Sequence, residues 1–493
     1  MEKPNLHHFS SLLLVFLFTL SLGTRTTAGR KFSIREATID DLQLAFKHNL
    51  LTSRQLVQFY LREIKRLNPF LRAVIEVNPD ALYLADKADY ERKTKAPSAS
   101  HSKLHGIPIL VKDNIATKDK LNTTAGSYAL LGSVVPRDAG VVTKLRNAGA
   151  IILGKASLSE WSYWRSNGAP SGWSARAAAN LATVTLGTET DGSILCPSSY
   201  NSVVGIKPTN GLTSRAGVVP ISLRQDTVGP ICRTVSDAAY VLDVIAGIDQ
   251  NDVATTKASR YIPKGGYAQF LRRDGLRGKR IGIVRALFNI SGQTSSTPIY
   301  EKHFNTLRKG GAVLVDNLKI PHFDEIYSDG SSETTALSAE FKIYINTYLK
   351  ELVASPVRSL ADLIAFNNKN AKLEKVKEYG QGRFLEAEAT NGIGSAEKAA
   401  LLNLARFAKD DYVNLVTKNK LDAVVAPLAK VSPLLAISGS PGVVVPAGYD
   451  DGVPVGLSFG GLRGWEPKLI EMAYGFEQAT KIRKPPSLTK LKF

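Results

Sequence analysis

Two segments of the sequence carry side chains suited to acyl-transfer chemistry, and the first presents a serine. It reads Gly187-Thr-Glu-Thr-Asp-Gly-Ser193 and follows the apolar run 182–186. Glycine lets the backbone bend sharply, so that successive N–H groups point at one spot. Such N–H groups can stabilise the oxyanion of an acyl-transfer intermediate. The segment therefore predicts a strand that breaks at Gly187 and presents Ser193 as a nucleophile.

The second segment places a lysine at the end of an apolar run, Gly106-Ile-Pro-Ile-Leu-Val-Lys-Asp113. We expect Ile107–Val111 to be a buried strand. Burial disfavours the charged form of an amine and lowers its pKa, which would make Lys112 available as a base. A lysine at a strand end more often extends its ammonium group into solvent. The spacing alone leaves both roles open.

Together with Val203-Val-Gly-Ile-Lys-Pro-Thr209, these segments resemble the amidase signature family. Members of that family hydrolyse carboxamides with a Ser–cis-Ser–Lys triad. The resemblance runs from about Ile39 to Pro486. It implies that Ser193 is the nucleophile, that Lys112 is the base, and that the substrate is a small-molecule amide. It implies no metal and no cofactor.

The same resemblance assigns further positions. The backbone N–H groups of the family's oxyanion hole, beside that of Ser193, match Thr190, Asp191 and Gly192. Asp113 and Asp226 also match family positions, and we expect them to hold the structure by hydrogen bonds rather than to transfer protons. Cys196 lies three residues after the nucleophile, and nothing in its sequence context indicates an activated thiolate.

The chain departs from the family pattern upstream of Ser193. Family members carry a Gly/Ser-rich stretch there, which holds the cis-Ser that bridges the lysine and the nucleophile. This chain has Gly168-Ala-Pro-Ser-Gly-Trp-Ser174, and an ungapped count puts Ala169 at the cis-Ser position. The run 169–176 instead resembles what plant members have before that stretch. We interpret the junction of Arg176 and Ala177 as the site of a deletion.

Two hypotheses follow from this departure. The chain is an amidase, or it is an amidase-like protein that is weak or inactive because Lys112 has no path to the Ser193 proton. General acid–base catalysis contributes about 10²–10⁴ in rate, so the loss would be large. Ser171 and Ser174 could replace the missing hydroxyl only if the chain took another route.

Other catalytic and binding chemistries find little support in the sequence. No histidine lies in a helical metal motif or a context typical of a catalytic histidine; those beyond the N-terminal segment are His48, His101, His105, His303 and His322. The net charge of +19 raises the question of nucleic-acid binding. Lys and Arg are spread along the chain without a recognisable nucleic-acid motif, which favours a solvated basic surface.

The N-terminus has the pattern of a cleaved secretory signal peptide over residues 1–28. Lys3 precedes the apolar stretch Leu12–Leu22, which is short for a membrane span, and Thr26 and Ala28 fit the positions before a cleavage site. An uncleaved anchor is the alternative. No second apolar run of that kind follows, so we expect a secreted protein, in the apoplast if the source is a plant, without a membrane span once it is processed.

Two further features belong to a secreted protein. The sequons at Asn122 and Asn289 would be candidates for glycosylation. The two cysteines, Cys196 and Cys232, are too few to stabilise a chain of 493 residues by disulfides, and their spacing does not fit a metal site. The sequence leaves open whether they pair.

The arrangement of elements indicates an α/β fold. Residues 30–90 are expected to be helical, with helix starts at Thr38 and Thr52 and a stop at Asn68-Pro69. Strand and helix patterns then alternate, and no repeat or linker divides them. We therefore predict a single large domain, residues 39–486, with a mixed sheet buried between helices.

Overall fold

The computed structural model describes residues 32–94, 101–169, 179–289, 297–328 and 332–487. The chain divides into two units after Ser33, and the second, Ile34–Phe493, contains the domain predicted over 39–486. The signal peptide predicted at 1–28 lies outside the described residues, as do Ser171 and Ser174.

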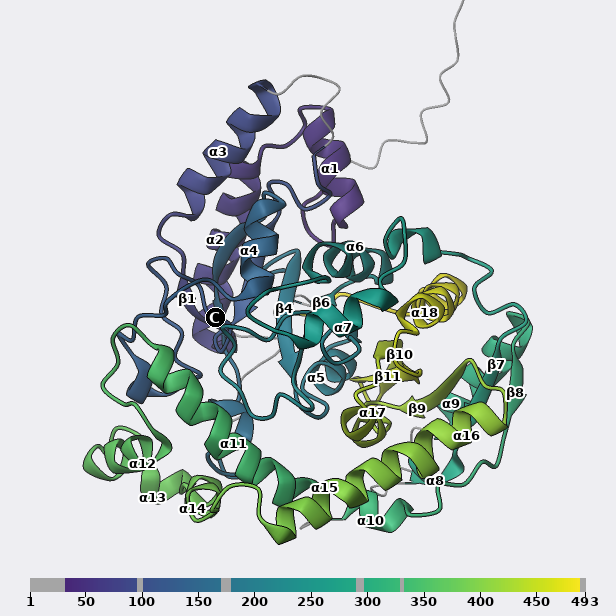
Figure 1. Ribbon diagram of the computed structural model, residues 1–493. Helices are drawn as coiled ribbons and strands as arrows, with labels where there is room; N and C mark the ends of the chain where they lie inside the picture. Colours follow the sequence, from purple (N-terminus) through teal and green to yellow (C-terminus); the bar gives the residue numbers. More distant parts are fainter. Residues whose placement is uncertain (1–31, 95–100, 170–178, 290–296, 329–331, 488–493) are drawn as a thin grey trace, which may run out of the picture. The chain divides into compact units, whose positions relative to one another are not determined.

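The described part of the second unit is built on an eleven-stranded mixed sheet (Figure 1). In sheet order the strands are β1 (Val74–Val77), β3 (Ile151–Ala156), β2 (Pro108–Lys112), β4 (Val184–Glu189), β6 (Thr227–Cys232), β5 (Val204–Lys207), β10 (Gly442–Asp450), β11 (Val453–Gly460), β9 (Ala423–Pro427), β7 (Arg280–Ile283) and β8 (Val313–Val315). β2 is parallel to β3 and β4, and β7 is parallel to β8 and β9. The remaining pairs are antiparallel. The predicted α/β class, a single large domain with a mixed sheet, is confirmed.

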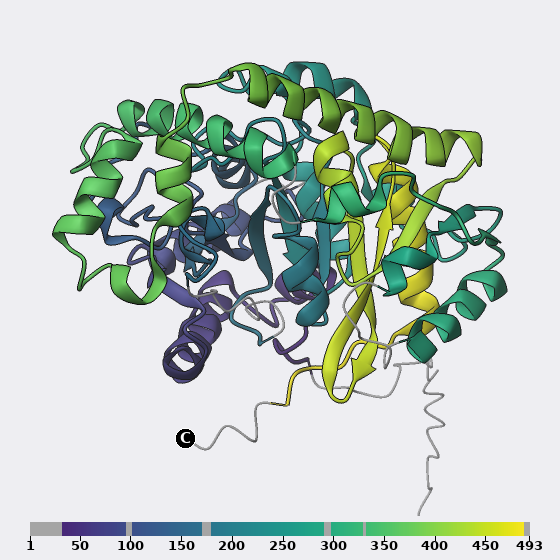
Figure 2. The same cartoon turned by 90° about the horizontal axis from the view of Figure 1, so that it is seen from below.

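Helices cover the sheet, with α6 and α18 on one face and α5 on the other (Figure 1). In Figure 2 the green helices of residues 332–418 lie together on one side of the sheet. The longer helices are α1 (Ile39–Lys47), α2 (Ser53–Leu71), α3 (Ala81–Thr94), α4 (Gly140–Asn147), α6 (Val235–Ile245), α9 (Thr297–Lys309), α11 (Ser332–Glu351), α12 (Leu360–Lys369), α14 (Gly382–Glu388), α15 (Ser395–Phe407) and α18 (Glu466–Thr480). The shorter ones are α5 (Leu195–Tyr200), α7 (Ala254–Ala258), α8 (Arg285–Asn289), α10 (Phe323–Tyr327), α13 (Val376–Tyr379), α16 (Asn414–Lys418) and α17 (Ser432–Ser438).

The central strands are buried on both faces, which explains their continuous apolar sequences. Every residue of β2, β3, β4, β5, β6 and β9 is buried. Buried strands read as apolar runs rather than as alternating patterns. Around β9 the core joins Leu195 of α5, Val424 of β9, Leu435 of α17 and Val444 of β10.

The predicted helix starts at Thr38 and Thr52 are confirmed. Each threonine caps its helix through its side chain and forms a complete capping box, Thr38 with Asp41 and Thr52 with Gln55. A box of this kind satisfies two backbone N–H groups that the first helical turn leaves without partners.

The prediction that residues 30–90 are all helical is wrong at one point. Strand β1 lies within this range and pairs antiparallel with β3. Helix α2 also continues through Pro69 to Leu71 instead of stopping at Asn68. A proline in the last turn removes only one helical hydrogen bond. The Asn68 side chain then accepts the N–H groups of Ala73 and Val74 at 2.8 and 2.9 Å, which turns the chain into β1.

Strand β4 also runs further than the sequence indicated. The break predicted at Gly187 is absent, because β4 stays paired with β6 as far as Glu189 opposite Thr227. At Gly187 a Cβ atom would approach the Ile231 Cδ1 atom to 3.0 Å, so the glycine allows close packing and does not mark a turn. The turn that presents Ser193 begins at Thr190.

The sequon asparagine Asn122 is partly buried and already bonded. Its Nδ2 atom lies 3.2 Å from both carboxylate oxygens of Glu76, and its Oδ1 atom accepts the N–H of Gly132 at 3.1 Å. A glycan on Nδ2 would have to displace the contact with Glu76. Glycosylation of Asn122 and Asn289 stays a prediction.

A buried charge cluster joins the segment after β3 to the helices of residues 360–388. The Arg165 side chain is fully buried and donates to Glu160 at 2.6 Å, to the carboxylate of Glu374 at 3.3 Å and to the backbone oxygen of Gly380 at 3.0 Å. The ring of Trp161 also packs on Phe384, with centroids 5.6 Å apart. These contacts hold the segment from Glu160 to Arg165 in place.

We expect Arg165→Met to lower the free energy of unfolding by about 3–5 kcal/mol, because the change leaves two buried carboxylates without their cation. Urea unfolding followed by circular dichroism measures the change. The matched control is Arg272→Met. Its pair with Asp274 is exposed on both sides, so its effect should be much smaller than that of Arg165→Met. Equal effects of the two substitutions would contradict this account of the cluster.

Candidate active site

Lys112 ends strand β2 and is buried, which is one of the two environments that the sequence left open. Its ammonium group donates to the Thr188 Oγ1 atom at 2.8 Å and to the Thr188 backbone oxygen at 3.3 Å. The Asn114 side chain donates to the same hydroxyl at 3.0 Å. Thr188, near the end of the neighbouring strand β4, therefore holds the lysine side chain.

Asp113, the next residue, has a structural position. Its carboxylate accepts the Thr124 hydroxyl and the N–H groups of Thr124 and Gly126, at 3.1 and 3.4 Å for the latter two. Burial raises the pKa of Asp113, while the charge of Lys155 opposes the rise. Lys155 is itself fully buried, and burial lowers its pKa to about 8. These contacts support the structural role expected for Asp113.

The nucleophile loop, Thr190–Ser193, joins β4 to α5. Gly192 has a φ of +77°, a conformation that favours glycine, and a Cβ atom there would lie 3.2 Å from the Ser432 Oγ atom. The Gly192 backbone oxygen accepts the N–H of Cys196 at 2.7 Å. This turn places Ser193 just before helix α5.

The buried carboxylate of Glu189 supports this loop from inside. It accepts the N–H groups of Ile194 at 2.6 Å and Leu195 at 2.9 Å, and the N–H of Gly192 also points towards it. Burial raises the pKa of Glu189, and the charge of Lys207 opposes the rise. Lys207 is fully buried in β5, where burial lowers its pKa to about 8.

Asp226 holds the other side of the loop. Its carboxylate accepts the Thr190 hydroxyl at 2.5 Å and the N–H groups of Ile221 and Ser222 at 2.8 and 3.0 Å. Burial raises the pKa of Asp226 to about 6, although the hydrogen bond from Thr190 opposes the shift. These contacts support the structural role expected for Asp226. They also direct the Thr190 hydroxyl to Asp226 instead of to the cavity.

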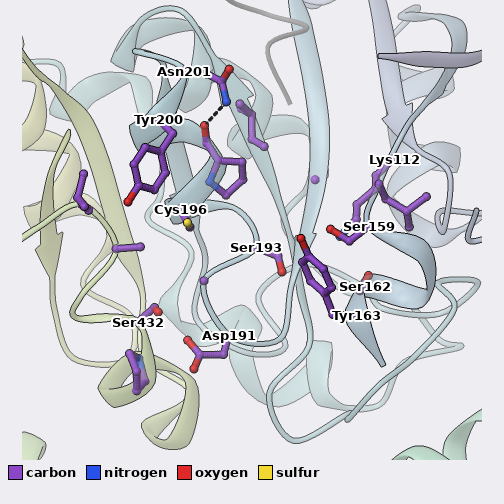
Figure 3. A pocket seen from close by; sticks show the side chains of 18 of the residues that line it. Lys112, Ser159, Ser162, Tyr163, Asp191, Ser193, Cys196, Tyr200, Asn201 and Ser432 are labelled. Carbon is purple, nitrogen blue, oxygen red and sulfur yellow. Dashed lines mark hydrogen bonds between the residues drawn. The ribbon is translucent and has the colours of Figure 1, made fainter. Parts of the chain in front are cut away.

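Lys112 and Ser193 line one cavity of about 780 Å³ (Figure 3). Asp191 and Gly192 of the loop line it as well, whereas the Thr190 side chain is directed to Asp226. Much of the remaining lining is apolar or aromatic: Leu158, Tyr163, Pro197, Tyr200, Ile231, Tyr327, Leu428 and Pro433. The charged side chains in the lining are Lys112, Asp191 and Lys430.

The sequence analysis missed the wall next to Lys112. Ser159, Ser162 and Tyr163 line the cavity beside Lys112 (Figure 3). Trp161, Ser162 and Tyr163 all have φ between 50° and 69°, a conformation that costs non-glycine residues about 1–3 kcal/mol each. The buried contacts of Arg165 with Glu160 and Glu374 hold this strained segment in place. Backbone strain leaves no sequence signal, so these residues could not have been selected from the sequence.

The opposite wall was also missed, because it comes from distant parts of the chain. Tyr327 ends α10, Lys430 follows β9, and Ser432 begins α17. Each lies more than a hundred residues from Ser193 in sequence. No motif links these positions. Helix α5 packs on β10 and β11, and β11 pairs with β9, so the residues that follow β9 come close to α5.

Asp191 contributes its side chain to the cavity as well as its backbone to the loop. Burial, followed by the neighbouring carboxylate of Glu333, raises the pKa of Asp191 well above its usual range, which favours the neutral form. A hydrogen bond with Ser432 opposes the shift. Its Oδ1 atom is buried and has no hydrogen-bond partner.

The histidines lie in other surroundings. The rings of His101 and His105 are 4.1 Å apart, and the His105 Nε2 atom lies 2.8 Å from Glu91. His303 contacts the backbone oxygen of Ala447, and His322 lies 2.9 Å from Asp411. Within the described ranges no group of three or more His, Cys, Asp and Glu is placed to hold a metal ion. No helix in those ranges is both long and apolar enough to span a bilayer.

The two cysteines are both free. Cys196 lines the cavity and Cys232 is buried in β6. Burial, then the charges of Glu189 and Asp191, raises the pKa of Cys196 to about 11, while Lys430 opposes the rise. This supports the expectation that Cys196 is not an activated thiolate.

Comparison with known proteins identifies the family. The family model Amidase matches the chain in two segments, residues 55–172 and 165–470. The chain belongs to the amidase family. The predicted resemblance is thereby confirmed, and with it the assignment to a family of amide-hydrolysing enzymes. The two matched segments overlap at residues 165–172, just before the junction of Arg176 and Ala177.

Individual relatives agree with the family. A probable amidase of Arabidopsis thaliana is 56% identical over 481 residues, with 92% of each protein covered. The native peptide amidase of Stenotrophomonas maltophilia is similar in structure, with a TM-score of 0.85 and 41% identity over 93% of this chain and 99% of that one. An amidase family protein of Bacillus anthracis has a TM-score of 0.85 and 33% identity, covering 92% and 93% of the two chains.

We expect Cys196 to react slowly with iodoacetamide although it lines an open cavity. A thiol with a pKa of about 11 is deprotonated at pH 8 on the order of a hundred-fold less than an ordinary thiol. Below its pKa the thiolate fraction, and so the rate, should rise about tenfold per pH unit. Mass spectrometry of the alkylated peptide measures the rate. In urea, Cys196 and Cys232 should react alike; equally fast labelling of folded Cys196 would show that its pKa is not raised.

Proposed function

We propose that the cavity is the site of a serine amidase in which Ser193 is the nucleophile and Lys112 the base. One observation carries the proposal: residues 81 positions apart in sequence, each selected by its own motif, line the same cavity. Ser193 would attack the carbonyl carbon of a carboxamide and form an acyl-enzyme. The proton would pass to Lys112 through a second hydroxyl and then to the departing ammonia or amine. Water would release the acid.

We infer that backbone N–H groups of the nucleophile loop stabilise the oxyanion. The sequence assigned this role to Thr190, Asp191, Gly192 and Ser193. The N–H of Gly192 points towards Glu189, so the donors proposed for the oxyanion are those of Thr190, Asp191 and Ser193. Each such donor is worth about 10²–10³ in rate.

The substrate we propose is a carboxamide with a sizeable acyl part. The cavity volume lies within the range usual for drug-sized ligands, about 300–1,000 Å³. Its aromatic and aliphatic lining favours an apolar acyl group. The similarity to a peptide amidase supports a bulky acyl group, such as that of a peptide amide.

We also propose that this chain lacks the bridging serine and is therefore a weak amidase. The family match breaks into two segments at 165–172, where the Gly/Ser-rich stretch should follow. The alignment with the Arabidopsis relative is 481 positions long, although it covers only 92% of the 493 residues of this chain, so some of its positions are gaps in this chain. That relative therefore carries residues without a counterpart here. Ala169, the ungapped match to the cis-Ser, is buried and has no hydroxyl.

We expect amidase activity to rise by about 10²–10⁴ when the missing stretch is restored, because Lys112 then regains a proton path to Ser193. A Gly/Ser-rich segment of the family's kind, with its cis-Ser, would be inserted between Arg176 and Ala177. Ammonia release from a panel of primary amides measures the activity.

The matched control is the same insertion with every serine changed to alanine, which restores length and packing without the bridging hydroxyl. It should stay as weak as the unmodified chain. If the unmodified chain already equals the restored one, the deletion argument is wrong. If the serine-free insertion is fully active, another hydroxyl bridges the two residues.

In both the unmodified and the restored chain, labelling by a serine-directed fluorophosphonate should require Ser193. Ser193→Ala should abolish labelling because it removes the nucleophile, and in the restored chain Lys112→Ala should lower labelling strongly because it removes the base. His101→Ala and His105→Ala should leave it unchanged, since neither lines the cavity. Label per folded molecule, checked by circular dichroism, is the measurement. Full labelling of folded Ser193→Ala would place the nucleophile elsewhere, with Ser171 and Ser174 tested first.

A further inference from the structure

Lys430 brings a second positive charge, besides that of Lys112, to the lining of the cavity. It follows β9, lines the cavity and is partly buried. Among the residues that the structure describes, no carboxylate lies within ion-pair distance of its ammonium group, and the group donates no hydrogen bond. An ammonium group held partly out of water without a partner gains most from an anion that enters with the ligand.

The backbone around Lys430 is fixed, so the side chain starts from a defined position. Its N–H donates to the oxygen of Pro427 at 3.0 Å, and its own backbone oxygen accepts the Tyr327 hydroxyl at 2.7 Å. Leu428, two residues earlier, has a φ of 51° and donates its N–H to Gly456 at 2.8 Å. Left-handed non-glycine residues of this kind are concentrated at binding and catalytic sites.

Lys430 also lies close to the nucleophile loop. Ser432, two residues later, approaches Gly192 so closely that a Cβ atom there would lie 3.2 Å from the Ser432 hydroxyl. The Lys430 ammonium group is near enough to Cys196 to oppose the rise in the thiol pKa. The positive charge of Lys430 therefore acts on Cys196, three residues after Ser193.

Among the described residues, the lining of the cavity offers this charge no partner. Lys112 is the other cation, and Asp191, the one acid among the lining residues, is shifted towards its neutral form by burial and by Glu333. Glu189 lies behind the loop, where Lys207 offsets it. The net charge of +19 on the whole chain adds a positive field that attracts anions.

We propose that Lys430 binds an anionic group on the acyl part of the substrate, so that the site prefers carboxamides that also carry a carboxylate. The inference rests on the proposed amidase function of the same cavity and names the substrate class within it. Lys430 acts in substrate selection and takes no part in bond breaking. The aromatic and aliphatic lining then holds the carbon chain between the carboxamide at Ser193 and the carboxylate at Lys430.

The test compares three amides of equal chain length that differ only in their far end. Monoamides of dicarboxylic acids carry a carboxylate, simple alkyl amides carry none, and ω-amino amides carry an ammonium group. Chains of four to ten carbons cover the unknown span. Calorimetric titration of the full chain with Ser193→Ala gives each dissociation constant without turnover.

The carboxylate ligand of best length should bind about tenfold or more tightly than its neutral counterpart, and the ammonium ligand should bind least well. Lys430→Gln keeps the aliphatic stem and should bring the ratio to about one. Lys430→Glu should reverse the order in favour of the ammonium ligand. The matched control is Lys65→Gln, an equal charge change at an exposed site in α2, which should leave the ratio unchanged. Added salt should reduce the ratio.

A carboxylate-to-neutral ratio near one in the parent chain would overturn the inference, and so would a ratio that survives Lys430→Gln. Fluorophosphonate labelling of Ser193 in the restored chain reports the amidase function separately. Retained labelling with no carboxylate preference would mean that the amidase proposal stands and the substrate class is wrong. Absence of both labelling and amide binding would overturn both.

Discussion

The contact between Glu189 and the backbone of the nucleophile loop is the constraint on which the rest of the site depends. A fully buried carboxylate is costly unless hydrogen-bond donors and a counter-charge surround it. The N–H groups of Ile194 and Leu195 are the donors, and Lys207 on β5 supplies the charge. To satisfy Glu189 the chain must turn tightly after β4, and that turn brings Ser193 to the cavity.

The same principle operates on the side of Lys112. Asp113 is buried next to it, accepts two backbone N–H groups and a hydroxyl, and faces the buried Lys155. A buried acid thus holds the backbone near each proposed reacting residue. Asp113 does so beside Lys112, and Glu189 does so behind the loop that carries Ser193. Buried carboxylates that accept several backbone N–H groups resist rearrangement, so the backbone around both residues is held in position before any substrate binds.

The sequence predicted what local patterns encode. Two capping boxes, the buried strands and the fold class follow from residues close together in the chain. The motifs around Lys112 and Ser193 are local too, but their pairing came from the family resemblance. It failed where tertiary contacts override local preference. Strand β1 forms because β3 offers an edge, and Gly187 stays in β4 because β6 pairs with it. Tyr327 and Lys430 line the cavity through long-range packing, such as that of α10 on α17, which single-sequence patterns do not encode.

The interactions that form the site and the hydroxyl proposed to activate it are separable. The bonds of Glu189, Asp113 and Arg165 described above join residues outside 170–178. A missing bridge would raise the reaction barrier by about 3–5 kcal/mol, as a factor of 10²–10⁴ in rate requires, without removing any of these bonds. A chain can therefore keep the amidase fold, a placed serine and a placed lysine while losing most of its turnover. The position of two reacting groups is evidence of family and of substrate geometry, and the proton path between them decides the rate.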